Sequence, residues 1–216
     1  MTERISPRQV AEAHGLDDWR VLPGGVWACA HFRTSSFSVG AALVQAISAA
    51  ATTVNRHPDV DLRPEGVTVR LRGDEPEGFR TRDLDLARTI SAAARALDAH
   101  ADPAAVQHVQ VALEALAAAQ VRPFWRAVLG YQDAGDADLV DPLRRGPSWT
   151  FPHTDDREPQ RDRPRAEVQL AADQLEERVA AAVAAGGRVV SDARAPQRWT
   201  LADPEGSEVD LTVWTP

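Results

Sequence analysis

Hydrophobic residues recur at helical spacing in three segments of the first half of the chain. Ser6 and Ser36 precede the first two segments as helix N-caps, and Thr81 caps the third. Pro58 stops the second helix, because a residue that precedes proline avoids helical backbone angles. The sequence therefore predicts helices over residues 7–14, 37–53 and 81–97.

Apolar and polar residues alternate between these helices, which is typical of half-buried strands. Residues 19–22 and 26–32 flank the turn Pro23-Gly24-Gly25 and predict a β-hairpin. Residues 60–63 and 67–72 predict a second pair of strands. The order helix, two strands, helix, two strands, helix predicts an α+β fold, with helices packed against an antiparallel sheet.

The second half of the chain repeats one order of elements. The predicted elements are a strand at 107–113, a helix at 119–129, strands at 139–140 and 148–151, and then a strand at 166–170, a helix at 173–185 and strands at 188–191, 199–202 and 208–214. The two copies begin roughly 55 residues apart, which indicates an internal repeat of fold. The change of pattern near Asp102-Pro103 predicts two domains, residues 1–102 and 106–216.

Composition narrows the function classes. The chain has 216 residues, 44% of them hydrophobic, which is enough to bury a core in one or two domains. All 24 basic residues are arginine, and 32 acidic residues bring the net charge to −8. Nucleic acid is excluded as the main partner, because phosphate binding needs a clustered positive surface. The single cysteine, Cys29, excludes an internal disulfide and a cysteine-rich zinc site.

The sequence contains no segment typical of membrane proteins or secreted proteins. Residues 1–10 are polar and include Pro7, so no secretory signal is expected. The most apolar stretch, residues 41–51, is interrupted by Gln45 and Ser48 and is too short to span a bilayer. We therefore expect a soluble, cytoplasmic protein without a membrane partner.

Three motifs of the first half point to a family. They are Val54-Asn55-Arg56-His57-Pro58-Asp59-Val60, Val67-Thr68-Val69-Arg70-Leu71 and Thr81-Arg82-Asp83. With the Trp19 hairpin and the Ser36-Phe37 helix start, this half resembles the pterin-4a-carbinolamine dehydratases. The resemblance implies a four-stranded antiparallel sheet backed by three helices. It also implies a hydro-lyase without a cofactor, which removes water from a 4a-hydroxytetrahydrobiopterin type of pterin to give quinonoid dihydropterin.

The family reaction needs an acid and a base, because a hydroxyl leaves the ring carbon while a proton leaves the adjacent nitrogen. The family pattern has two adjacent histidines before a proline, a third histidine after the next strand, and a later aspartate. His57 and Asp83 match the second histidine and the aspartate. Arg56 occupies the first position, and the third histidine has no counterpart after Leu71.

The two missing histidines determine which residues we expect in the catalytic site of the first half. An arginine stays protonated, so Arg56 is a poor acid or base but could hold a pterin oxygen or stack on its ring. Asp74 could replace a histidine in part, because burial raises the pKa of a carboxylate. The predicted catalytic residues are His57, Asp83 and Asp74, and the predicted substrate contacts are Arg56, Asn55, Pro58 and Arg72. In the competing interpretation His57 only closes a helix C-terminus and Asp83 only stabilises a helix N-terminus.

The second half resembles the glyoxalase-like branch of the vicinal-oxygen-chelate superfamily. The motifs are Phe124-Trp125-Arg126-Ala127-Val128-Leu129-Gly130-Tyr131, Ala185-Gly186-Gly187 and Asp203-Pro204-Glu205-Gly206-Ser207-Glu208-Val209-Asp210-Leu211. The resemblance implies two βαβββ units whose sheets curl around a cleft. It also implies a divalent metal, commonly held by histidine and carboxylate on the first and last strand of each unit.

His108 and Asp210 fall near two of these ligand positions, whereas Trp149 and Arg165 fall at the other two. An arginine repels a cation, so we expect no metal. A cleft lined by these four residues suits an anionic or planar organic ligand, which would be a second small-molecule partner. In the alternative interpretation Trp125, Trp149, Trp199 and Trp214 belong to the core.

Three functions follow from these resemblances. The first is a pterin dehydratase whose activity is reduced by the missing histidines. The second is a non-catalytic scaffold that binds a pterin or another small molecule and assembles as a homo-oligomer, which the dehydratase resemblance implies in either case. The third is a glyoxalase-like domain that acts on a small carbonyl or aromatic compound.

Overall fold

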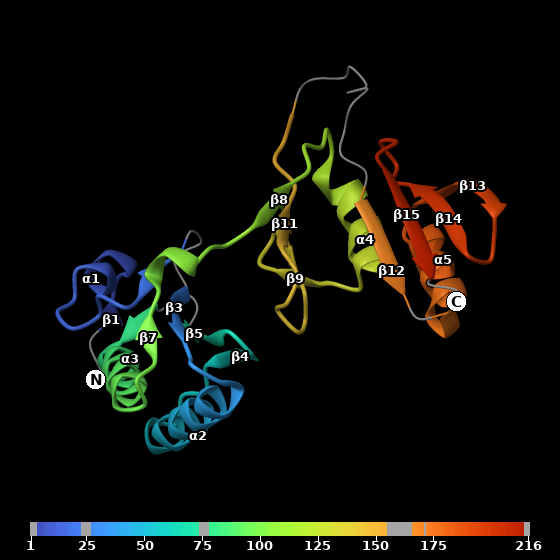
Figure 1. Ribbon diagram of the computed structural model, residues 1–216. Coiled ribbons are helices and arrows are strands. Elements are labelled where there is room, and N and C mark those ends of the chain that lie inside the picture. The colour runs from blue at the N-terminus through green and yellow to red at the C-terminus, as the bar shows by residue number, and fades with distance from the viewer. Residues whose placement is uncertain (1–3, 23–26, 74–77, 155–165, 171, 214–216) are drawn as a thin grey trace. The chain divides into compact units, whose positions relative to one another are not determined.

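The computed structural model describes residues 4–22, 27–73, 78–154, 166–170 and 172–213. The chain forms two compact units, Met1–His108 and Val109–Pro216 (Figure 1). Both units combine helices with sheets, so the predicted α+β class is confirmed. The predicted turn at residues 23–25 and Asp74, Arg165 and Trp214 lie outside the described residues.

The helices of the first unit are α1 (Pro7–Ala11), α2 (Phe37–Val54) and α3 (Thr81–Ala96). The hydroxyl oxygens of Ser6 and Ser36 accept bonds from the third residue of α1 and α2, as their N-cap positions predict. The N-cap of α3, however, is Arg80 and not Thr81. The prediction was wrong by one residue, because the carboxylate of Asp83 accepts the backbone N–H of Arg80 and fixes the helix start there.

The main sheet of the first unit is antiparallel throughout. Its strands are β2 (Arg20–Val21), β3 (Trp27–Arg33), β4 (Asp59–Arg63) and β5 (Gly66–Arg72), in the order β2-β3-β5-β4. A two-residue strand, β7 (His100–Ala101), also pairs with β3 and was not predicted. β1 (Arg4–Ile5) forms a separate two-stranded sheet with β6 (Phe79–Arg80). β6 directly precedes α3 in the chain. A 3-10 turn, η1 (Pro103–Ala105), follows β7.

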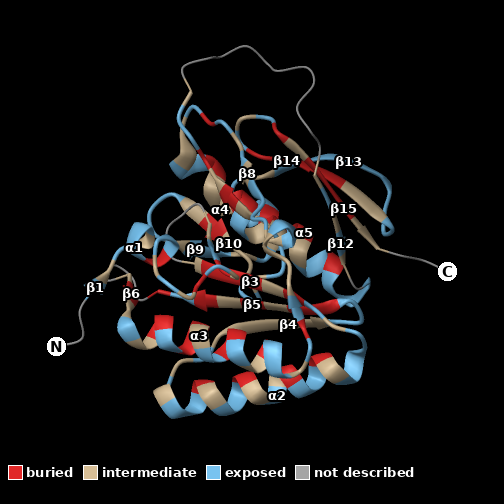
Figure 2. Cartoon of the chain, turned by 60° about the vertical axis from the view of Figure 1, so that its left-hand side comes forward, coloured by how far each residue is buried: buried red, intermediate tan, exposed pale blue. Residues whose placement is uncertain are grey.

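Alternate residues of β3 and β5 form one side of the first core. Phe32 and Val69 are almost fully buried and belong to the same apolar cluster as Leu43 and Ile47 of α2 and Ile90 of α3. Figure 2 shows buried residues along β3, β5 and α3, and exposed residues along much of α2. The register of β3 and β5 places Trp27 opposite Arg72 and Cys29 opposite Arg70 on the other face of the sheet.

Helix α2 is unusually apolar for its length. Among the described residues it alone has the length and hydropathy of a membrane span, with a mean hydropathy of 1.5 over its 18 residues. Its buried residues Gly40, Leu43, Ile47 and Ala51 supply part of the core of the first unit. A helix in the core of a folded domain meets the same criteria of length and composition.

The second unit contains the predicted repeat. The first copy consists of β8 (Gln110–Ala112), α4 (Ala118–Leu129), β9 (Gln132–Ala134), β10 (Asp138–Val140) and β11 (Ser148–Thr150). The second consists of β12 (Ala166–Leu170), a 3-10 turn η2 (Ala172–Gln174), α5 (Leu175–Ala184), β13 (Arg188–Arg194), β14 (Arg198–Ala202) and β15 (Glu208–Val213). The two sheets have the same strand order, β8-β11-β10-β9 and β12-β15-β14-β13. In each copy the strand that comes first along the chain pairs in parallel with the strand that comes last, β8 with β11 and β12 with β15.

The two βαβββ copies share one core and one buried polar network. Phe124 and Trp125 of α4 cluster with Val179 of α5 and with strands of both sheets. Asp203, which is 1% exposed, accepts the indole N–H of Trp125 at 2.9 Å. Glu205 accepts the backbone N–H groups that precede α4, from Leu116 at 2.9 Å and Ala117 at 2.7 Å. Side chains of the second copy therefore complete the start of the helix in the first copy.

Candidate functional site

A turn after α2 positions the first group of candidate residues. Asn55 ends the helix with a φ of 50°, a left-handed conformation that asparagine tolerates better than most residues. The N–H of Arg56 then bonds to the carbonyl of Ala51 at 3.0 Å, which closes the helix end. Pro58 follows His57 and leads into β4, so His57 lies in the short connection between the helix and the strand.

The side chain of Arg56 is fixed by two partners. Its Nε donates to Oδ1 of Asp83 at 2.7 Å, and its Nη2 donates to the backbone carbonyl of Arg72. The Arg56 side chain is 17% exposed and the Asp83 side chain is 1% exposed, so this ion pair is largely desolvated. Asp83 also lines a small apolar cavity with Trp19 and Leu84, which increases its dependence on Arg56 for charge compensation.

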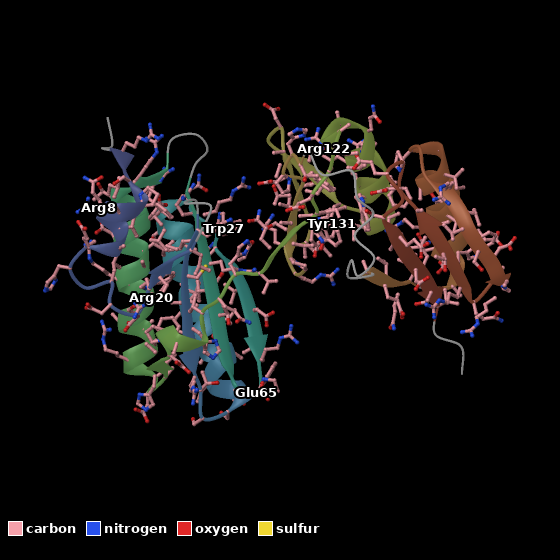
Figure 3. All side chains as sticks on the ribbon, turned by 90° about the horizontal axis from the view of Figure 1, so that it is seen from above. Arg8, Arg20, Trp27, Glu65, Arg122 and Tyr131 are labelled. Carbon is pink, nitrogen blue, oxygen red and sulfur yellow. The ribbon has the colours of Figure 1, made fainter. Side chains whose placement is uncertain are left out.

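His57 itself is exposed, and within the described residues it makes no hydrogen bond or ion pair. At the end of β5 whose carbonyl bonds to Arg56, the Arg72 guanidinium lies 5.7 Å from the centre of the Trp27 ring. Figure 3 labels Trp27 among the side chains of the first unit. This cation–π pair places a flat aromatic surface and a positive charge on the face of the sheet opposite the helices.

A second polar group lies in the sheet of the second βαβββ copy. Asp210 of β15 is 1% exposed, and its Oδ1 accepts the hydroxyl of Thr200 at 2.6 Å. Its other oxygen accepts a short hydrogen bond from the guanidinium of Arg198. Burial of the carboxylate is thus compensated by an arginine from the neighbouring strand.

The first unit has clear relatives in sequence. The family model for pterin 4 alpha carbinolamine dehydratase matches residues 3–93. A Nocardia farcinica protein named "Putative pterin-4-alpha-carbinolamine dehydratase" is 37% identical over 95 residues, which cover 44% of this chain and 98% of that protein. This chain belongs to the pterin-4a-carbinolamine dehydratase family. The model for a glyoxalase-like domain matches residues 110–212, so the dehydratase-like unit is followed by a glyoxalase-like unit.

Other relatives match the dehydratase-like unit as well. A Herpetosiphon aurantiacus protein of the same printed name is 35% identical over 72 residues, or 33% of this chain and 73% of that protein. A crystal structure described as a transcriptional coactivator/pterin dehydratase from Brucella melitensis covers 43% of this chain and 99% of its own, with 24% identity and a TM-score of 0.39.

Several predicted site residues of the dehydratase-like unit lie together. Arg56 and Asp83 form an ion pair, and the carbonyl of Arg72 accepts a bond from the same guanidinium. Asn55, His57 and Pro58 form the adjoining turn, whereas Asp74 is outside the described residues. The contact of Arg72 with Trp27 was not predicted, although the alternation of β3 and β5 could have indicated it, because these residues are opposite in the register.

The structure describes three of the four predicted cleft residues of the glyoxalase-like unit. His108 is exposed and lies just before β8, because that strand begins at Gln110 and not at residue 107 as predicted. Trp149 does not face a cleft: it stacks on Trp125 with ring centroids 4.8 Å apart and lies in the hydrophobic core. For Trp125 and Trp149 the structure therefore agrees with the alternative interpretation, in which they belong to the core. Arg165 is outside the described residues, and only Asp210 remains at a polar position.

Cys29 is not available as a neutral-pH nucleophile. The pKa of its thiol is raised to about 11, chiefly by burial; the charge of Arg70 opposes this shift, and that of Asp59 adds to it. Because the thiolate is the reactive form, alkylation of the folded protein by iodoacetamide at pH 8 should be roughly a hundredfold slower than that of the urea-unfolded chain. Mass spectrometry over time would measure both rates, and equal rates would contradict the buried position of Cys29.

Proposed function

We propose that the dehydratase-like unit removes water from a pterin 4a-carbinolamine, with His57 as its acid–base group and at a reduced rate. The observation that supports this is the exposed imidazole of His57 directly after Arg56, whose guanidinium is fixed by Asp83 and by the Arg72 carbonyl. An exposed imidazole that follows a fixed cation directly in the chain offers a proton-transfer group close in sequence to a contact for a polar heterocycle.

The reaction breaks the bond between the ring carbon and its hydroxyl and removes a proton from the adjacent ring nitrogen. The products are water and quinonoid dihydropterin, so protons and electrons balance without an oxidant or reductant. In our proposal His57 protonates the leaving hydroxyl, which departs as water. A solvent water then takes the nitrogen proton, and the imidazole regains a proton from solvent, so that no net proton is gained or lost. One histidine then serves where the family pattern implies several, which is the reason for the expected low rate.

Arg56 and Asp83 take different roles in this proposal. Arg56 is a substrate contact, because its guanidinium is held in place and remains a cation at all relevant pH values. Asp83 is a positioning residue, since its two oxygens bond to Arg56 Nε and to the Arg80 N–H and not to His57. Arg72 links this group to Trp27, because its carbonyl accepts a bond from Arg56 while its guanidinium lies over the Trp27 ring.

A dehydration assay with freshly generated carbinolamine tests the proposal. We expect the full chain to exceed the rate in buffer and His57→Ala to lose most of that gain. His14→Ala is the matched control, because His14 is another exposed histidine of the first unit and lies in the segment between α1 and β2. A full chain no faster than buffer, or a His57→Ala variant as fast as the parent, would exclude the catalytic proposal.

Binding without turnover is the second candidate. The observation that favours it is that both carboxylate oxygens of Asp83 already accept hydrogen bonds. Of the predicted catalytic residues that the structure describes, only His57 then has no hydrogen-bond partner. Calorimetric titration with a reduced pterin would reveal this function. Binding that Arg56→Met weakens, in a protein that does not accelerate dehydration, would favour the scaffold over the enzyme.

A further inference from the structure

A row of polar side chains crosses the second sheet of the glyoxalase-like unit. Glu167 of β12 is the register partner of Asp210, and Thr200 of β14 is its partner on the other side. The neighbouring residues of β15, Val209 and Leu211, are fully buried in the core that includes α5. Because strand residues alternate between faces, the polar row occupies the face that this core does not use.

Arg198 supplies the positive charge of this row. Its Nη2 donates to Oδ2 of Asp210, while the Thr200 hydroxyl donates to Oδ1, so both carboxylate oxygens have a partner. The hydrogen bond and the charge of Asp210 raise the pKa of Arg198, and the charge of Glu167 raises it further. The Arg198 side chain remains 36% exposed, whereas the Asp210 side chain is 2% exposed.

The glyoxalase resemblance implies a divalent metal near the position of Asp210, and the residues present do not fit one. A divalent cation needs several anionic or neutral donors, and a guanidinium at the carboxylate repels it. His108 precedes β8 and is not on a strand of this unit, and Trp149 stacks in the core. The part of the chain that the structure describes contains no group of three His, Cys, Asp or Glu side chains that could hold a metal.

We infer that Arg198 takes the place of a metal ion in this unit, as a built-in cation that neutralises Asp210 and keeps the polar row closed to divalent metals. The inference rests on the contacts of Arg198 and Asp210 and is independent of the dehydratase reaction. It predicts a unit whose stability depends on the arginine and does not respond to metal removal.

Thermal unfolding and metal analysis of the full chain test this inference. The parent protein should retain no stoichiometric divalent metal, and neither EDTA nor added Mn²⁺ should shift its unfolding midpoint. Arg198→Met should lower the midpoint by roughly 5–10 °C, because it leaves the buried carboxylate of Asp210 without a positive partner. Mn²⁺ should recover part of that loss, since Asp210 and Glu167 can then offer oxygen donors to a cation.

Three further variants make the test specific. Arg194→Met is the matched control, because Arg194 is the exposed register partner of Arg198 on β13 and has no ion pair among the described residues. It should leave the midpoint and the metal response unchanged. Arg198→Lys keeps the charge and should remain insensitive to Mn²⁺, and Arg198→Met with Asp210→Leu should recover stability without metal.

Two results would overturn the inference. One is a parent protein that retains a stoichiometric divalent metal and releases it when Asp210 is changed to Asn. The other is an Arg198→Met variant that unfolds at the parent midpoint and does not respond to Mn²⁺, since Arg198 would then compensate no buried charge. If Arg198→Met does not fold, the Arg198→Lys variant decides, because a gain of stability with Mn²⁺ in that variant contradicts a built-in cation.

Discussion

Arg56→His is expected to raise the rate of carbinolamine dehydration about a hundredfold over the parent protein, which is the lower end of the gain from one general acid or base. In the parent, Arg56 is a fixed cation that holds the carboxylate of Asp83. The substitution places a second proton-exchanging side chain beside His57 and next to a buried carboxylate that can orient it. A stopped-flow assay on the full chain would measure the rate.

Arg56→Gln is the control for this variant. Glutamine also breaks the ion pair with Asp83 and removes the cation, but it cannot exchange protons. If the rate rises equally with histidine and with glutamine, loss of the arginine and not gain of an imidazole is responsible. If neither variant is faster than the parent, an imidazole at position 56 does not act as a second acid–base group.

Asp83→Ala is expected to lower the free energy of unfolding of the dehydratase-like unit by about 3 kcal/mol, near the lower end for breaking a buried ion pair. The change leaves the Arg56 guanidinium, which is 17% exposed, without its carboxylate. It also removes the acceptor for the Arg80 N–H at the start of α3. Urea unfolding followed by tryptophan fluorescence would measure the loss, because Trp19 lies in this core.

Asp85→Ala provides the matched comparison on the same helix. The Asp85 side chain is 60% exposed and pairs with Arg88 at a spacing of three residues, so its loss should cost less than about 0.5 kcal/mol. The double change Asp83→Leu with Arg56→Met should recover much of the stability, because it removes both buried charges together. Equal losses for Asp83→Ala and Asp85→Ala would show that burial of the ion pair does not stabilise the unit.

Local signals in the sequence were sufficient for most elements. Helix α2 was predicted over residues 37–53 and extends over Phe37–Val54, because Ser36 caps its start and Pro58 prevents its continuation. The strand β9 was missed because its residues, Gln132–Ala134, are polar or small and show no apolar alternation. Its place in the sheet comes from pairing with β10, a contact that a local pattern does not encode.

The candidate site was only partly predictable, for a physical reason. The motif around His57 identified the residues, but not that Arg56 would bond to Asp83, which lies 27 positions further along the chain. Such partners are set by how α2 and α3 pack, and not by spacing within a motif. The same holds for Trp149, whose orientation depends on Trp125 of α4, and for Arg198, whose role appears only in the register of β14 and β15.

The turn at Asp203–Gly206 looks like a simple surface hairpin between β14 and β15, and protein engineers would choose such a loop for a tag, a cut site or a circular permutation. Here its two carboxylates bond to the start of α4 and to the indole of Trp125. The two βαβββ copies are therefore one unit for engineering purposes, even though they are repeats. A chain shortened to the first copy would lose the acceptors for the start of α4 and for a buried indole N–H.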